Sequence, residues 1–190
     1  MKIHLVGPGG AGKSTVCALL AGRLHMAFID LDLRFRERDG NISNYLQRHG
    51  YTAYAHQNVD LYGSTVAHED GVIALSSGFM TYTGTVHPRY SELRAAIAES
   101  RTTFVLLPTF DVETCVAEIV RRQMQRPLRL TASHEEAKIR ARFPVYMALS
   151  APKVTTMQPV DSVVSEIIDA LARPCAESGI SQDPPSRAGV

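Results

Sequence analysis

Several features that would point to particular protein classes are missing from this chain of 190 residues. No apolar run approaches the roughly 18 to 20 residues of a membrane-spanning helix, and the first apolar segment is too short for a secretory signal. The formal net charge is only +1, so the overall balance gives no broad basic field to attract nucleic acid or an anionic membrane. We therefore expect a cytoplasmic protein with neither of these partners.

Cysteine is also scarce, with three residues in the whole chain. Cys17, Cys115 and Cys175 form an odd number at wide spacings, which matches neither a disulfide framework nor a zinc site. Reduced thiols in a cytoplasm fit this pattern better. Cys17 and Cys115 fall in helical patterns, where we interpret them as small apolar packing residues rather than reactive thiols.

The most informative motif that is present covers residues 7–14. Its sequence, GPGGAGKS, has the form GxxxxGKS of a phosphate-binding loop, in which glycines let successive backbone N–H groups point at phosphate oxygens. Lys13 is predicted to reach the β- and γ-phosphates of a nucleotide, and Ser14 to ligate magnesium. The predicted nucleotide-binding residues are Gly7, Gly9, Gly10, Ala11, Gly12, Lys13, Ser14 and Thr15.

The context of this loop agrees with a phosphate site. Residues 3–6 form a short apolar run typical of a buried parallel strand, and apolar residues recur at spacings of three and four over residues 16–24. The helix that begins near Lys13 adds its positive N-terminal end. A chance glycine-rich turn is the alternative, and the strand before the loop and the helix after it argue against that alternative.

Strand-like and helix-like segments alternate along the rest of the chain. Alternation implies a parallel sheet covered on both faces, with ligands at the carboxyl ends of the strands. We therefore predict an α/β fold with three α/β/α layers and a five-stranded parallel sheet. The further predicted strands are residues 27–31, 72–75, 103–107 and 154–157. The predicted helices are residues 91–99, 111–122 and 163–171, and the capping-box spacing from Ser133 to Glu136 predicts the start of another.

Two segments depart from this alternation. Residues 42–64 are polar and rich in tyrosine, which predicts a small helical excursion that walls an acceptor pocket. After Pro174 the composition changes to Ser, Gly, Pro and Asp, which predicts a disordered tail. We therefore expect a single domain over residues 1–173, with the excursion at about residues 33–64, and a tail over residues 174–190.

Asp30 and Asp32 end the second predicted strand, and carboxylates two residues apart in a strand point to the same side. One carboxylate near a magnesium-bound triphosphate can hold the metal through water, and the other can accept the proton of an attacking hydroxyl. An ordinary acidic turn after a strand is the alternative.

Arginines form the next group of candidate site residues. Arg121, Arg122 and Arg126 gather at the end of a predicted helix, where guanidinium groups on a mobile segment can neutralise a transferring phosphoryl group and exclude water. A basic helix terminus favoured by the dipole is the alternative. Pro144 is expected to stop the helix just after Arg142, which would project that guanidinium toward an acidic small molecule or simply toward solvent.

Taken together, these segments resemble the shikimate kinase family over most of residues 1–160. The resemblance rests on the phosphate loop, FIDLD at 28–32, the turns at Gly40 and Gly50, VIALSSG at 72–78, RPL at 126–128 and RFPVY at 142–146. RPL followed by RxPxY is more specific than any phosphate loop. The resemblance implies a P-loop fold like that of nucleoside-monophosphate kinases, and transfer of the γ-phosphate of ATP to a hydroxyl of shikimate or a related small cyclic polyol or acid.

The resemblance also implies roles for individual residues. Asp30 and Ser14 would hold Mg²⁺, and Asp32 would contact the acceptor hydroxyl as orienting group or base. Arg126 would belong to a lid at about residues 121–135, and Arg122 would lie near the adenine. The implied catalytic residues are then Lys13, Asp32 and Arg126, and the implied acceptor-binding residues are Asp32, Ser77, Gly78 and Arg142. Kinases of this architecture often act as monomers, so a monomer is expected.

Departures from the family pattern gather in the acceptor pocket. Where the family carries Phe-Arg, this chain has Tyr54-Ala55, so one of two carboxylate-binding arginines is missing. Arg36 and His56 are the candidates to replace it. In addition, Ser76 and Ser77 stand at two positions of a triple glycine, and Asn58 stands where an acidic residue is usual.

An altered acceptor pocket beside an intact nucleotide site leaves three functions open. The first is an active kinase for shikimate or a related acceptor. The second is a nucleotide-binding regulatory protein that keeps this fold without shikimate kinase activity, although such a protein has less use for Asp32. The third is a nucleoside or nucleotide kinase, against which the order of RPL and RxPxY argues.

Overall fold

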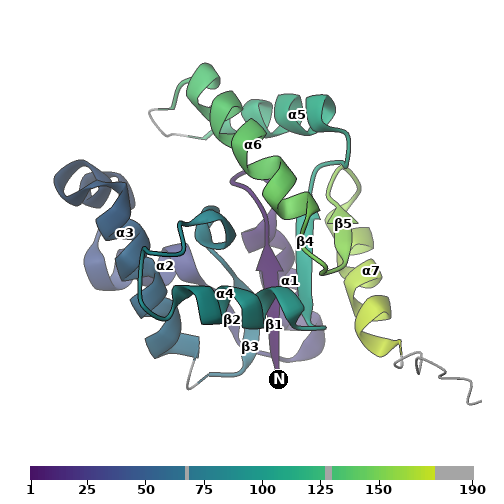
Figure 1. Cartoon of the computed structure of the whole chain (residues 1–190). Helices are drawn as coiled ribbons and strands as arrows, with labels where there is room; N and C mark the ends of the chain where they lie inside the picture. The colour runs from purple at the N-terminus through teal and green to yellow at the C-terminus, as the bar shows by residue number, and fades with distance from the viewer. Residues whose placement is uncertain (67–68, 127–129, 174–190) are drawn as a thin grey trace, which may run out of the picture.

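The computed structural model describes residues 1–66, 69–126 and 130–173, and the arrangement of its elements is shown in Figure 1. A five-stranded parallel sheet with the order β2-β3-β1-β4-β5 forms the centre of the molecule. This confirms the predicted sheet. Its strands are β1 (Lys2–Val6), β2 (Phe28–Asp30), β3 (Gly71–Ala74), β4 (Thr103–Leu107) and β5 (Lys153–Thr155).

Helices cover both faces of the sheet, and the alternation of side chains along β4 divides the core in two. Phe104 and Leu106 pack with apolar residues of α1 (Lys13–Leu24) and α7 (Val160–Ala172). Val105 and Leu107 point to the opposite face. There they pack with α2 (Leu31–Asp39), α3 (Ile42–Val66), η1 (Phe79–Thr81), α4 (Tyr90–Glu99), α5 (Val112–Met124) and α6 (Ala132–Met147). The predicted three-layer α/β/α architecture is confirmed.

The predicted excursion is helical and consists of α2 and α3, which lie to one side of the sheet in Figure 1, apart from α5 and α6. Gly50 interrupts α3 with φ 79° and ψ 170°, a conformation that favours glycine. The chain therefore changes direction within α3.

Expectations about the ends of two elements were wrong. Strand β2 ends at Asp30, which is the N-cap of α2, so Asp32 lies in the first turn of a helix and not in a strand. Helix α6 begins at Ala132, before Ser133, and continues through Pro144 to Met147. Pro144 cannot donate a helical hydrogen bond, but its carbonyl accepts the amide of Ala148 at 3.0 Å and the fully buried Tyr146 anchors the last turn in the core.

The two described cysteines are packing residues, as predicted. Cys17 and Cys115 are fully buried, and burial raises the pKa of their thiols to about 12 and about 11. Within the parts of the chain that the structure describes, no helix combines the length and the apolarity needed to cross a membrane. Cys175, the predicted tail at 174–190 and two residues of the RPL motif, Pro127 and Leu128, lie outside the described residues.

Candidate active site

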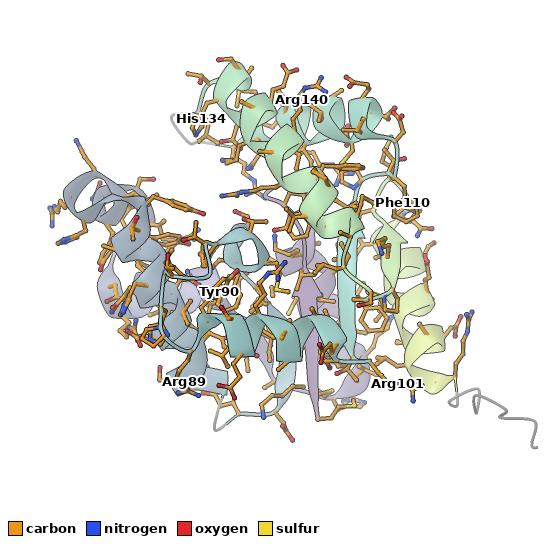
Figure 2. The ribbon with its side chains drawn as sticks, in the orientation of Figure 1. Arg89, Tyr90, Arg101, Phe110, His134 and Arg140 are labelled. Carbon is orange, nitrogen blue, oxygen red and sulfur yellow. The ribbon has the colours of Figure 1, made fainter. Side chains whose placement is uncertain are left out.

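A cavity of about 550 Å³ lies at the carboxyl ends of β1, β2 and β3, where the alternating pattern predicts a ligand site. Its walls come from segments that are far apart in the sequence. They are the phosphate loop, the start of α2, the part of α3 around Gly50, the segment after β3, the end of α5 and one side of α6. His134, labelled in Figure 2 near the N-terminal end of α6, belongs to the last of these walls.

Glycine is required at particular points of the phosphate loop. A Cβ atom on Gly7 would collide with the carbonyl oxygen of Leu106, so the loop runs directly against β4. Gly12 has φ 87° and is the N-cap of α1, so the loop passes into the helix through a left-handed conformation. This arrangement points the N-terminal end of α1 into the cavity, as a phosphate site requires.

Lys13 is the central cation of the cavity, and it is buried. Its Nζ atom donates hydrogen bonds to the carbonyl oxygens of Gly7 at 2.8 Å and Pro8 at 2.9 Å. Burial lowers the pKa of Lys13 to about 8, although the charges of Asp32 and Asp30 oppose that shift.

Asp30 and Asp32 both line the cavity, but they are held differently from the strand geometry that the sequence predicts. The Oδ1 atom of Asp30 caps α2 by accepting the backbone amides of Asp32 at 2.9 Å and Leu33 at 3.1 Å. The Oδ1 atom of Asp32 accepts the hydroxyl of Ser76 at 2.5 Å. The helix turn, and not strand pleating, therefore brings the two carboxylates to one cavity.

The residues predicted to hold magnesium fit such an ion chemically. Ser14 and Asp30 both line the cavity, and hydroxyl and carboxylate oxygens are the hard ligands that Mg²⁺ takes in proteins. Since the cap bonds of Asp30 use Oδ1, its other carboxylate oxygen is the one suited to a metal or to a water bound to it.

Arg142 and the segment after β3 form the side of the cavity assigned to the acceptor. The Arg142 guanidinium donates to the carbonyl oxygen of Ser77 at 3.3 Å and to the hydroxyl of Tyr51 at 2.9 Å. A Cβ atom on Gly78 would lie 2.5 Å from the Tyr51 hydroxyl and 3.1 Å from the guanidinium. The two polar groups therefore converge over Gly78, where a larger residue has no room.

The structure separates the two candidates for replacing the missing arginine. Ala55 is 1% exposed and belongs to the core. His56, beside it, is exposed and its ring faces Asp60 at 3.3 Å; it is not among the residues that line the cavity, so the proposed compensation by His56 was wrong. Arg36 does line the cavity.

The predicted arginine group divides into three positions. Arg122 donates to the carbonyl oxygens of Gly10 at 3.2 Å and Thr156 at 2.9 Å, so it ties the phosphate loop to the end of β5. Arg126 lines the cavity. Arg121 is exposed and pairs with Glu118. Of the predicted lid, residues 127–129 lie outside the described part of the chain.

Among the cavity-lining residues that sequence reasoning missed, Gln123 and Lys138 share a buried partner, Glu135, which lies behind the lining. Gln123 lies over the phosphate loop, where its Nε2 atom would be 2.5 Å from a Cβ on Gly9. It donates to the buried carboxylate of Glu135 at 3.2 Å, and Glu135 also pairs with Lys138. Lys138 precedes Arg142 by four residues, so helical spacing puts both cations on one face of α6. That spacing was a usable signal, whereas nothing in the sequence marks Gln123.

A separate cluster of potential metal ligands lies outside the cavity. His56, Asp60 and His87 offer ligand atoms within 4.8 Å of one another. However, Nδ1 of His87 accepts the amide of Arg89 at 3.1 Å, so the ring hydrogen of the neutral imidazole is on Nε2, which faces Asp60 at 3.0 Å. Ligation of a metal through Nε2 would require that hydrogen to move to Nδ1 and would break the hydrogen bond from Arg89. The cluster is therefore a hydrogen-bonded contact between α3 and the segment before α4.

Comparison with known proteins agrees with this geometry. A family model described as shikimate kinase matches residues 9–172 of the chain. The chain belongs to the shikimate kinase family. Its relatives in this family include the shikimate kinase of Zymomonas mobilis, which is 32% identical over 178 residues that cover 90% of this chain and 93% of the relative.

Solved structures support the fold. A shikimate kinase from Acinetobacter baumannii in complex with shikimate superposes with a TM-score of 0.71 at 22% identity, covering 90% of this chain and 92% of that one. A deoxyadenosine kinase from M. mycoides with bound dATP gives a TM-score of 0.53 at 12% identity, covering 91% of this chain and all of that one (100%). The predicted resemblance to the shikimate kinase family and the P-loop kinase fold are confirmed.

Proposed function

We propose that this member of the shikimate kinase family transfers the γ-phosphate of ATP to a hydroxyl group of shikimate. One observation carries the proposal: the phosphate loop with Lys13, the carboxylate of Asp32 and the guanidinium of Arg142 line a single cavity. A donor site, a proton acceptor and an anion-binding group are the components that phosphoryl transfer to a hydroxylated acid requires.

The reaction proceeds by direct transfer. The oxygen of the acceptor hydroxyl attacks the γ-phosphorus, the bond from that phosphorus to the oxygen bridging it to the β-phosphorus breaks, and ADP leaves with the electron pair. Asp32 orients the hydroxyl and takes its proton. Lys13 and Arg126 neutralise charge on the phosphoryl oxygens, so the protein supplies position and electrostatics rather than a covalent intermediate.

The proposal includes a magnesium ion, for which the cavity offers two ligand residues. Ser14 and Asp30 would hold the ion, which supplies positive charge to the β- and γ-phosphate oxygens. On the acceptor side, Arg142 binds the carboxylate of shikimate as the retained arginine of the family pattern, and Arg36 takes the place of the missing one. Ser77 and Gly78 form the floor of that pocket.

The regulatory alternative, a nucleotide-binding protein without activity, is not favoured. A protein that only binds nucleotide has no requirement for Asp32 in the cavity or for Arg142 opposite it. The family match over residues 9–172 supports the kinase instead. We further propose that residues 1–173 form one catalytic domain that acts as a cytoplasmic monomer, with residues 33–64 as the acceptor-binding part.

Acceptor-dependent ADP release tests this function. Purified protein with MgATP is assayed with shikimate, quinate, aminoshikimate or no acceptor, and Lys13→Ala serves as the control that lacks the central cation. We expect ADP release that depends on shikimate in the wild type and is absent in the variant. Activity with another acceptor alone would establish a changed substrate, and no activity with any acceptor would favour the regulatory alternative.

A further inference from the structure

The hydroxyl of Ser76 contacts the proposed proton acceptor, Asp32. The family pattern does not contain this contact, because a glycine is usual at position 76. Ser76 follows β3 by two residues and is 3% exposed. Its Oγ atom donates to Oδ1 of Asp32 at 2.5 Å, across a sequence separation of 44 residues. A hydroxyl donor to a carboxylate forms one of the shorter and stronger kinds of hydrogen bond.

The direction of this hydrogen bond is fixed by Asn58. Asn58 is fully buried, and its Nδ2 atom donates to Oγ of Ser76 at 2.9 Å. An amide nitrogen can only donate, so the serine oxygen accepts from Asn58 and its single hydrogen is left for Asp32. Asn58, Ser76 and Asp32 therefore form a one-way chain of donors that ends at the carboxylate.

The two carboxylate oxygens of Asp32 differ in their hydrogen bonds. Tyr54 also directs its hydroxyl at Oδ1, at the longer distance of 3.4 Å. In the part of the chain that the structure describes, no hydrogen-bond donor contacts Oδ2. Two donors on one oxygen oppose rotation of the carboxylate and leave the other oxygen able to accept a hydrogen from the cavity.

We propose that Ser76, held by Asn58, is a positioning residue that fixes the Asp32 carboxylate so that Oδ2 accepts the proton of the acceptor hydroxyl. This inference rests on the proposed function. In the transfer step the acceptor oxygen forms its bond to the γ-phosphorus of ATP, the bond from that phosphorus to the ADP oxygen breaks, and the acceptor proton passes to Oδ2. Ser76 touches neither reactant and acts only through Asp32.

The same short segment also fixes the opposite side of the pocket. The carbonyl oxygen of Ser77 accepts the hydroxyl of Tyr146 at 2.6 Å and the guanidinium of Arg142 at 3.3 Å. Residues 76 and 77 thus connect the proton acceptor with the anion-binding group through adjacent positions of one backbone. The spacing between Asp32 and Arg142, which the acceptor must match, is set by this connection.

A double-mutant cycle tests the positioning role. Ser76→Ala is expected to lower kcat for shikimate phosphorylation by about 10-fold, or ~1.4 kcal/mol, with the KM for MgATP unchanged. In the Asp32→Asn background the same substitution is expected to cause no further loss, because the group it positions no longer accepts a proton. Ser76→Thr, which keeps the hydroxyl, is expected to restore most of kcat.

Thr103→Val is the matched control. Thr103 is fully buried, donates its hydroxyl to the carbonyl oxygen of Ile97 at 2.7 Å, and is not among the residues that line the cavity. The Thr103→Val variant therefore loses a buried hydrogen bond from a hydroxyl, as Ser76→Ala does. It is expected to lower the melting temperature while kcat stays within about twofold of the wild type. Ser76→Gly provides a second variant at the site, should Ser76→Ala not fold.

The outcomes separate this inference from the proposed function. An unchanged kcat in folded Ser76→Ala and Ser76→Gly, or an equal loss of kcat in the wild-type and Asp32→Asn backgrounds, would overturn the positioning role while shikimate phosphorylation stands. Absence of shikimate-dependent turnover in the wild type would overturn both. A loss of kcat that Ser76→Ala causes in the wild-type background but not in the Asp32→Asn background supports the inference.

Discussion

At the scale of single residues, Lys13 has a property that ordinary lysines lack. Because burial lowers its pKa to about 8, the ammonium group loses its proton within a range of pH that is easily reached. A triphosphate binds the charged form and therefore competes with deprotonation. Nucleotide affinity should respond to pH through this one residue.

We predict that the Kd for ATP rises by up to tenfold per pH unit above about pH 8, and that ATP binding at pH 8.5 takes up protons. Isothermal titration calorimetry in buffers of different ionisation enthalpy measures both quantities. At pH 6.5, where Lys13 is already charged, proton uptake by this group should vanish. An affinity that stays constant between pH 7 and pH 9.5 would contradict the role of the buried ammonium.

Residues also differ in how well the sequence predicted their positions. The phosphate loop was predictable because its contacts are local: glycines and Lys13 lie within eight consecutive residues, 7–14. The contact of Asp32 with Ser76 was not, because 44 residues separate them and only the order of strands brings them together. His56 was assigned to the pocket from its neighbour Ala55, but successive residues of a helix point in different directions.

At the scale of elements, α6 connects the acceptor side of the cavity to the core. Tyr146 is fully buried in its last turn and donates to the carbonyl oxygen of Ser77 at 2.6 Å. The helix continues past Pro144 because tertiary contacts of this kind outweigh the local effect of proline. The motif at residues 142–146, whose proline predicts the end of a helix, is therefore the part of α6 that contacts the segment after β3.

Tyr146→Phe should weaken this connection without emptying space in the core. We expect a loss of about 1 kcal/mol in the free energy of unfolding, together with a several-fold higher KM for shikimate and an unchanged KM for MgATP. Chemical denaturation and steady-state kinetics measure these effects.

Tyr90→Phe is the control for that prediction. Tyr90, labelled in Figure 2, starts α4 and donates its buried hydroxyl to the carbonyl oxygen of Phe79 at 2.6 Å. Its substitution should lower stability to a similar extent and leave the KM for shikimate as it was. Equal effects of the two substitutions on that KM would refute a specific role for Tyr146.

At the scale of the whole molecule, the central strand of the sheet carries one buried titratable group. His4 of β1 is 6% exposed, and Nε2 lies 2.9 Å from the hydroxyl of Tyr62 on α3. Burial lowers the pKa of His4 to about 4. Folding therefore requires the neutral imidazole, whereas the unfolded chain binds a proton below about pH 6.5.

Because the unfolded state then holds more protons, stability must fall as pH decreases from about 6.5 to 4. This group alone contributes a loss of about 3 kcal/mol over that interval. We predict that His4→Gln flattens this part of the stability profile, as measured by urea unfolding at several pH values. His49→Gln, at an exposed position of α3, should leave the profile as in the wild type, and an unaltered profile for His4→Gln would contradict the assignment.

The overall architecture was the most predictable level. Alternating apolar patterns predict a parallel sheet but not the order of its strands. The family resemblance supplies the P-loop kinase fold, which the superpositions support. What the pattern could not supply is the cavity network of Gln123, Glu135 and Lys138, because it depends on how α5 and α6 face each other across the phosphate loop.

Identification of the product tests the proposed activity most directly. The protein is incubated with MgATP and shikimate, and the phosphorus-containing products are resolved by ³¹P nuclear magnetic resonance. We predict one new monophosphate ester formed in equal amount with ADP, and neither in the absence of protein. ADP accompanied only by inorganic phosphate, or unchanged ATP, would contradict phosphoryl transfer to shikimate.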